Sequence, residues 1–126
     1  MSSAYVDSSA VVAIAFGEPG GAALARRLGR LESAYTSNLT EAEVLAALAR
    51  EGAAAPRSLF SVFSWVLPQR PLGEEIARAL KAGRLRGADL WHVACALYLE
   101  PDPDELVFLT VDARQKAVAS RLGFTV

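Results

Sequence analysis

The sequence predicts an α/β fold, a single-domain three-layer sandwich with a mainly parallel central sheet flanked by helices. Three observations lead to this prediction. Short apolar runs alternate with helical segments along the chain, which is the order of elements in parallel α/β proteins. The run 106–111 is continuously apolar, as is typical of a parallel strand covered on both faces. The length of 126 residues and the apolar content of 52% suit one hydrophobic core.

In the first part of the chain, short strands precede polar residues that favour helix starts. Asp7 follows the apolar run 4–6 and suits the N-cap of a helix, which Gly17 and Pro19 end. In the next helix, leucines recur at a spacing of three to four residues, with arginines on the other face. The predicted elements are strands at 4–6 and 35–37 and helices at 10–16, 22–31 and 40–52.

The second part of the chain is predicted to continue the alternation. Pro56 suits the first turn of a helix through Phe63, and residues 65–67 form either the end of that helix or a strand. The helix that opens at 87–89 is apolar almost all round, so it is expected to be buried on most sides. The remaining predicted elements are helices at 73–82, 87–99 and from Asp112 onward, strands at 106–111 and 123–126, and a charged loop at 101–105.

The bulk properties exclude several classes of protein. A net charge of −1 argues against a broad duplex-binding protein, which needs a large excess of Lys and Arg. No apolar run reaches the length of a membrane span, so no membrane association is expected. The N-terminus lacks the basic and apolar regions of a signal peptide, and the single cysteine, Cys95, cannot form an internal disulfide. These features predict a cytoplasmic protein.

Four acidic residues stand where predicted elements begin or end. Asp7 and Asp112 follow two predicted strands, and ligands of open parallel sheets bind outside the carboxyl ends of the strands. Asp89 opens the most apolar helix, and Glu43 lies one turn into its own helix. If the two strands are neighbours, these four carboxylates converge on one crevice.

Each acid also has a purely structural interpretation. The three aspartates could be N-caps, and Thr40-x-x-Glu43 matches a capping box. A cluster of such carboxylates persists only if protons or cations neutralise it, and hard oxygen ligands suit Mg²⁺ or Mn²⁺. Zinc is disfavoured because the chain holds one His and one Cys.

Other catalytic chemistries find little support in the sequence. It contains no phosphate-binding P-loop, no dinucleotide-binding glycine pattern and no G-x-S-x-G nucleophile elbow. Cys95 lies in an apolar stretch where a thiol usually serves packing. His92 follows Asp89 by three residues and is expected to be a hydrogen-bonded residue that supports the site from the core rather than a catalytic base.

The four acids and their local sequences resemble the PIN-domain nucleases, and most closely the VapC toxins of bacterial toxin–antitoxin pairs. Residues 5–10, Tyr-Val-Asp-Ser-Ser-Ala, resemble the first strand of the family with its first metal-binding Asp. Residues 40–45 resemble the segment that carries the Glu, and residues 89–94 resemble the D-A-x-H-x-A helix start. Residues 109–112, followed by 119–124, resemble the T-x-D ending. The resemblance covers nearly the whole chain and implies one PIN-like domain over residues 1–126.

The resemblance implies a Mg²⁺-dependent endoribonuclease, with Mn²⁺ as a second possible ion, in which a metal-activated water hydrolyses RNA. It also implies a homodimer and a cognate antitoxin protein that binds the toxin. Glu41 and Glu43 compete for the position of the family's Glu, and Glu43 is chosen because it directly precedes Val44-Leu45. The expected metal ligands and catalytic residues are Asp7, Glu43, Asp89 and Asp112, the supporting residues are Ser9, Thr110 and His92, and the candidate RNA-backbone contacts are Arg84, Arg86 and Arg114.

Two other functions fit the acids less well. A non-catalytic PIN-like module could bind RNA or a protein with the acids as caps, and a phosphatase could use Asp7 as nucleophile, although no D-x-D motif follows it. An apolar stripe is either an antitoxin contact or ordinary core, and core is the favoured interpretation. It consists of Leu59, Phe60, Val62, Phe63 and Trp65.

Overall fold

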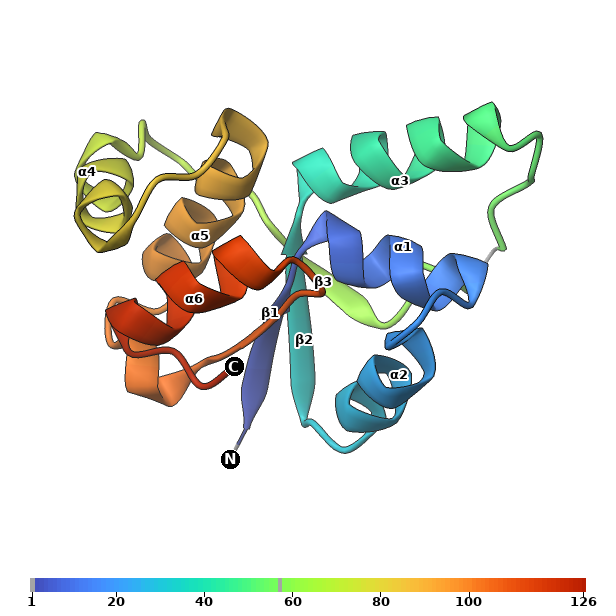
Figure 1. The fold of residues 1–126 in the computed structure, drawn as a ribbon, viewed down its shortest axis with the longest axis horizontal. Coiled ribbons are helices and arrows are strands. Elements are labelled where there is room, and N and C mark those ends of the chain that lie inside the picture. Colours follow the sequence, from blue (N-terminus) through green and yellow to red (C-terminus); the bar gives the residue numbers. More distant parts are fainter. Residues whose placement is uncertain (1, 57) are drawn as a thin grey trace.

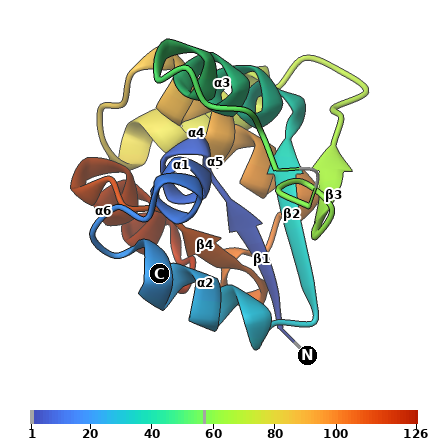
Figure 2. The ribbon, with the colours of Figure 1, turned by 90° about the vertical axis from the view of Figure 1, so that its right-hand side faces the viewer.

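The computed structural model describes residues 2–56 and 58–126, and within them four strands form one parallel sheet. The strand order is β3-β2-β1-β4, so β1 and β2 are the central strands. Figure 2 shows β3 at one edge and β4 at the other. The strands are β1 (Ser3–Val6), β2 (Ser33–Ser37), β3 (Phe63–Val66) and β4 (Val107–Leu109). The predicted parallel sheet is confirmed.

Helices cover both faces of this sheet, which gives the predicted three layers. Figure 1 shows α1, α2 and α3 on one side and α4, α5 and α6 on the other. The helices are α1 (Ser8–Phe16), α2 (Gly21–Gly29), α3 (Asn38–Arg50), α4 (Gly73–Ala82), α5 (Gly87–Leu99) and α6 (Ala113–Leu122), with a short 3₁₀ turn at Pro103–Glu105. Helix α3 begins two residues before the predicted Thr40.

Two hydrophobic cores follow from the alternation of side chains along β1. Tyr5 packs into the core beneath α4, α5 and α6, whereas Ala4 and Val6 pack into the core beneath α1 and α3. Helix α5 contributes a run of fully buried residues from His92 to Leu97, as its apolar sequence predicted. Burial raises the pKa of the Cys95 thiol to about 12, which agrees with the packing role predicted for it.

The strand register aligns the carboxyl ends of β1 and β4. Val6 pairs with Leu109, and the amide of Asp7 donates a hydrogen bond of 3.1 Å to the carbonyl oxygen of Leu109. Residues that follow β1 and residues that follow β4 therefore lie side by side at one edge of the sheet.

The helix predicted from Pro56 to Phe63 is wrong. Residues 58–62 form turns, and β3 then pairs with β2, with Phe63 opposite Ala34 and Val66 opposite Ser37; residue 57 lies outside the described residues. The alternative left open for residues 65–67 is settled as a strand that ends at Val66. Sheet pairing of the aromatic and β-branched residues outweighs the local helix signal of the proline.

The predicted strand at 123–126 is reduced to one bridge, between Val107 and Thr125. Gly123 ends α6 in the left-handed conformation, with φ of 108°, and turns the chain back toward β4. The amide of Phe108 then donates to the carbonyl oxygen of Thr125 at 2.8 Å. The predicted strand 106–111 is likewise shorter and spans Val107–Leu109.

The apolar stripe is only partly core. Leu59, Phe60 and Phe63 pack against the core beneath α1 and α3, but Val62 is 61% exposed and Trp65 is 37% exposed. An antitoxin contact at this stripe stays a prediction.

Among the described residues no single helix is long and apolar enough to cross a membrane, although the pair α1 and α2, bent by 108°, passes that test of length and composition when taken together.

Close packing of α1 against α2 depends on a glycine. A Cβ atom on Gly21 would lie 2.3 Å from the carbonyl oxygen of Ala13 and 2.7 Å from its carbonyl carbon. These are backbone atoms of a helix, so α1 and α2 would have to separate to admit a methyl group.

We therefore expect Gly21→Ala to lower the free energy of unfolding by about 1–3 kcal/mol, the usual cost of overpacking. Gly29→Ala is the matched control in the same helix, because nothing lies within 4 Å of its added Cβ. The control should leave stability unchanged or raise it by up to about 1 kcal/mol. Urea unfolding of both variants measures the difference, and equal midpoints would contradict the close approach.

Candidate functional site

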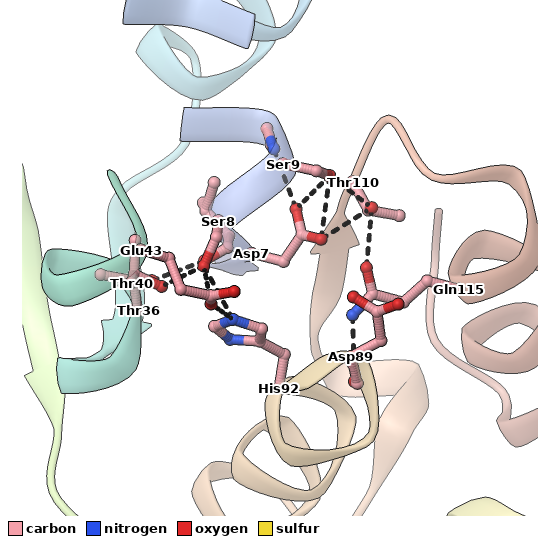
Figure 3. A network of polar contacts seen from close by, with 12 residues as sticks. Asp7, Ser8, Ser9, Thr36, Thr40, Glu43, Asp89, His92, Thr110 and Gln115 are labelled. Carbon is pink, nitrogen blue, oxygen red and sulfur yellow. Dashed lines mark hydrogen bonds and ion pairs between the residues drawn. The ribbon is translucent and has the colours of Figure 1, made fainter. Parts of the chain in front are cut away.

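Asp7 lies at the junction of β1 and α1 and is 1% exposed. Its carboxylate is the N-cap of α1, since Oδ1 accepts a hydrogen bond of 3.0 Å from the amide of Ala10. The hydroxyl of Ser9 lies 2.9 Å from both carboxylate oxygens, and the hydroxyl of Thr110 donates to Oδ2 at 2.9 Å. The cap interpretation of Asp7 is confirmed, and the same side chain lies at the centre of a polar network (Figure 3).

The two hydroxyls are themselves held by backbone amides. The amide of Val111 donates to Ser9 Oγ at 3.2 Å, and the amide of Asp112 donates to Thr110 Oγ1 at 3.0 Å. Because each hydroxyl oxygen already accepts from an amide, its own proton is available for the carboxylate of Asp7. The turn after β4 thus orients both partners of Asp7.

Burial raises the pKa of Asp7 above its usual value. The hydrogen bond from Ala10, the nearby imidazole of His92 and the hydroxyls of Ser9 and Thr110 act in the opposite direction. The direction of the shift means that the fold disfavours the negative charge even with these partners.

Asp112 and Gln115 link α6 to the same network. Asp112 is the N-cap of α6, as predicted, and accepts from the amide of Gln115 at 2.8 Å. The side chain of Gln115 is fully buried, with its Oε1 2.9 Å from the Thr110 hydroxyl oxygen, and its amide group donates to the backbone carbonyl of Asp89 at 3.1 Å. Gln115 ties the start of α5 to the end of β4. This role of Gln115 was not predicted from the sequence, although a glutamine three residues after an N-cap aspartate was the available signal.

Asp89 lies in the first turn of α5 and is not its cap. The N-cap position is Arg86, and no side-chain cap hydrogen bond is formed there, so the cap interpretation of Asp89 is wrong. Burial raises the pKa of Asp89, and the charges of Asp112 and Glu43 raise it further. Asp112 and Glu43 are therefore each close enough to repel the carboxylate of Asp89.

The capping-box interpretation of Thr40 and Glu43 is also wrong, because α3 begins at Asn38 and Thr40 lies inside the helix. Glu43 instead accepts from Ser8 Oγ at 2.5 Å and lies 2.9 Å from His92 Nε2. The hydrogen bond with His92 is the main cause of the lowered pKa of Glu43. Glu41 is exposed on α3, so Glu43 is the acid of this pair that reaches the network.

His92 is 1% exposed and connects Glu43 to the core. Its Nδ1 lies 2.7 Å from the hydroxyl of Tyr5, and its Nε2 lies 2.8 Å from Ser8 Oγ. Burial keeps the pKa of the Tyr5 hydroxyl well above its usual value, so Tyr5 stays protonated and can donate to Nδ1. His92 then presents Nε2–H to Glu43. The expected hydrogen-bonded role of His92 agrees with these contacts; Tyr5 and Ser8 were missed, although Ser8 directly follows Asp7.

The four acids surround one region but do not form a tight cage. Within the described parts of the chain, the only three acidic, His or Cys residues whose ligand atoms all lie within 4.8 Å of one another are Asp102, Asp104 and Glu105, all exposed and outside this network. Two ligands of one Mg²⁺ are at most about 4.2 Å apart, twice the usual bond length. In this arrangement no more than two of the four acids can contact one ion directly, and water would complete its shell.

The three arginines of the sequence analysis are exposed. Arg84 and Arg114 line one hollow of about 400 Å³ together with Arg121, which the sequence analysis missed. Arg86 lies near Asp89, where its charge lowers the carboxyl pKa. All of them belong to the α5 and α6 side of the molecule.

The model of the PIN domain family matches residues 4–121. The chain belongs to the PIN-domain family. It is also 35% identical over 130 residues to Ribonuclease VapC46 of Mycobacterium tuberculosis, an alignment that covers 100% of this chain and 97% of that protein. The family resemblance and the fold class predicted from the sequence are confirmed.

The buried charge of Asp7 leads to a stability prediction for this PIN domain. A carboxyl group with a raised folded pKa binds its proton more tightly in the folded state, so its contribution to stability falls as pH rises from the unfolded pKa, near 3.8, through the folded value. Asp7→Asn removes the charge and keeps an N-cap oxygen. In EDTA at neutral pH we expect it to unfold at a higher temperature than the wild type.

The increase in thermal midpoint caused by Asp7→Asn should become smaller as pH falls from the folded pKa of Asp7 toward the unfolded pKa, because the wild-type carboxyl then becomes neutral. Exposed Glu18→Gln is the control and should leave the thermal midpoint unchanged. Thermal unfolding monitored by circular dichroism across this pH range measures both. A lower midpoint for Asp7→Asn at neutral pH would show that the hydrogen bonds outweigh the burial of charge.

Proposed function

We propose that this PIN-domain protein is a metal-dependent endoribonuclease, the toxin of a type II toxin–antitoxin pair, which hydrolyses RNA phosphodiester bonds. The observation that carries the proposal is that Asp7 and Asp112 follow the neighbouring strands β1 and β4, while the charges of Asp112 and Glu43 both act on Asp89. The carboxyl pKa values of Asp7 and Asp89 are raised. The similarity to Ribonuclease VapC46 supports the same activity. The proposal takes residues 1–126 as one domain.

The donor set fits a hard divalent cation, and we propose Mg²⁺, with Mn²⁺ as a substitute. The repulsion of Asp89 by Asp112 and by Glu43 is of the kind that a cation relieves. Carboxylate oxygens are the ligands that Mg²⁺ prefers, and its tendency to keep several waters suits acids that are too far apart for a closed cage. Bound Mg²⁺ would supply a water of lowered pKa and neutralise charge on the phosphate.

The residues around the acids act as positioning groups in this proposal. Ser9 and Thr110 fix the carboxylate plane of Asp7, while Ser8 and His92 hold Oε1 of Glu43 and leave its other oxygen available. Rigid support of this kind favours one orientation of the water and the phosphate.

Arginines beside the acids are proposed to hold the RNA backbone. Arg86 lies close to Asp89, and Arg84 and Arg114 share a hollow on the α6 side. Arginine suits this role because its planar fork donates two hydrogen bonds to a phosphate.

The toxin assignment carries further proposals with it. A cognate antitoxin would bind this chain and block the acidic pocket, the protein would act as a homodimer, and it would work in the cytoplasm. The antitoxin and the homodimer follow from the resemblance to VapC toxins, and the cytoplasmic location follows from the sequence features given above. Co-purification with the product of a neighbouring reading frame would test the antitoxin.

The central prediction concerns the acids. We expect RNA cleavage to need Mg²⁺ or Mn²⁺ and to stop in EDTA. Each of four substitutions should lower kcat/KM by about 100-fold or more, because even the outer groups of metal sites contribute 10–100-fold. These are Asp7→Asn, Asp89→Asn, Asp112→Asn and Glu43→Gln. The matched control is Asp104→Asn in the exposed cluster near Pro103, which should cleave as fast as the wild type. The assay follows labelled tRNA, rRNA and mRNA fragments.

If the wild type cleaves none of these RNAs with either metal, the protein is a binding module and the proposal fails. If Asp104→Asn is as impaired as Asp7→Asn, the metal acts at the exposed cluster instead.

A second prediction concerns Thr110. Thr110→Val removes the hydroxyl that donates to Asp7 but keeps the side-chain volume, so we expect a 10–100-fold loss of activity with weaker binding of Mn²⁺. Raised Mn²⁺ should restore part of the activity. Thr125→Val, far along the chain on the exposed terminal segment, is the control. Unchanged Mn²⁺ affinity in Thr110→Val would contradict the orienting role.

A further inference from the structure

A second hollow lies beside the acids, between α2 and the start of α6. Its volume is about 450 Å³, and it combines two cationic side chains with an apolar wall and one hydroxyl. Its lining residues include Arg27, Lys116, Leu24, Val111, Pro19 and Thr110. None of the proposed catalytic acids and none of the arginines discussed so far belongs to it.

The cations of this hollow have no acidic partner. Among residues 2–56 and 58–126, neither Arg27 nor Lys116 lies within 4.0 Å of a carboxylate oxygen, and the lining contains no acid. Two such charges on the wall of a hollow favour an anionic ligand.

The apolar wall suits the non-ionic part of a nucleotide. Val111 is 44% exposed, and it faces the same hollow as Leu24 and Pro19. A base or ribose has flat or weakly polar faces that such a wall can cover, while its phosphate needs the cations. Inorganic phosphate alone would leave the apolar wall in water.

Thr110 connects this hollow directly to the acidic region. The residue lines the hollow, and its hydroxyl donates to Asp7 Oδ2 at 2.9 Å. The amide of Asp112 donates to the same hydroxyl oxygen at 3.0 Å. One side chain, that of Thr110, therefore separates a ligand in the hollow from the Asp7 carboxylate.

Helix α6 separates this hollow from the one lined by arginines. Lys116 belongs to the first and Arg114 to the second, and residues two apart on a helix project about 200° from each other. Asp112 caps the end of α6 between them. Cationic hollows thus lie on both sides of α6, the helix whose N-cap is Asp112.

We propose that the hollow lined by Arg27, Lys116, Leu24 and Val111 binds the nucleotide next to the cleaved bond, so that single-stranded RNA crosses the N-terminal end of α6 from this hollow to the one lined by Arg84, Arg114 and Arg121. This inference rests on the proposed ribonuclease function and adds the path of the substrate.

The test compares two double variants with equal loss of charge. Arg27→Gln/Lys116→Gln removes the cations of the hollow, and Arg26→Gln/Arg30→Gln removes two exposed cations in or beside α2 that do not line it. Both are built on Asp7→Asn to prevent cleavage, and binding of a fluorescein-labelled single-stranded RNA of mixed sequence is measured by fluorescence anisotropy in Mg²⁺. Thermal unfolding checks that both remain folded.

We expect the hollow variant to bind the RNA with an affinity about tenfold lower than that of the control variant. The slope of the logarithm of the association constant against the logarithm of the salt concentration should be shallower by about 1.4, because each lost phosphate contact reduces it by about 0.7 for single strands. In cleavage assays with residue 7 restored, KM should rise more than kcat falls. Removing one nucleotide of the RNA on one side of the cleaved bond should weaken RNA binding by the control variant but not by the hollow variant.

Equal affinity and equal salt dependence in the two double variants would overturn the proposal. If the wild type still cleaves RNA in that case, only the role of the hollow in RNA binding is excluded. A wild type that neither binds nor cleaves RNA would exclude the ribonuclease function as well. Unchanged RNA binding with weaker binding of a polyglutamate peptide to the hollow variant would also overturn it, in favour of a protein-docking face.

Discussion

The burial of one carboxylate, that of Asp7, constrains the rest of the site. The side chain must cap α1, and it lies beneath the turn that follows β4, where water cannot solvate its charge. Ser9 and Thr110 compensate part of this cost, and their positions depend in turn on the amides of Val111 and Asp112. The register of β1 against β4 is therefore as important to the carboxylate as its own position after the strand.

Helix α5 joins the two halves of the polar network. His92 projects toward Glu43 and Ser8 on the α3 side, while Asp89, one turn earlier, lies toward α6 (Figure 3). The deep burial of this helix fixes both residues, because its apolar side chains leave little freedom to rotate or shift. A polar site with strict geometry thus depends on an apolar helix.

Sequence reasoning found the acids because their positions at element ends coincide with a family pattern, and it found the parallel sheet because the strands and helices alternate. It erred where local signals competed. Pro56 suggested a helix, but Phe63–Val66 pairs with β2, and Thr40-x-x-Glu43 suggested a cap, but α3 begins at Asn38. In both places the deciding partner lies elsewhere in the chain, on β2 in one case and on α5 in the other.

The sequence by itself determined the order of most elements, the apolar character of α5, and two caps, since these depend on neighbours within a few residues. Only the tertiary structure decided that Gln115 bridges Thr110 and the start of α5, that Tyr5 faces His92, and that Arg27 and Lys116 share a hollow. Hydrogen bonds and charges act over a few ångströms, and the residues concerned are separated by up to about ninety positions along the chain. No local pattern records which of them meet.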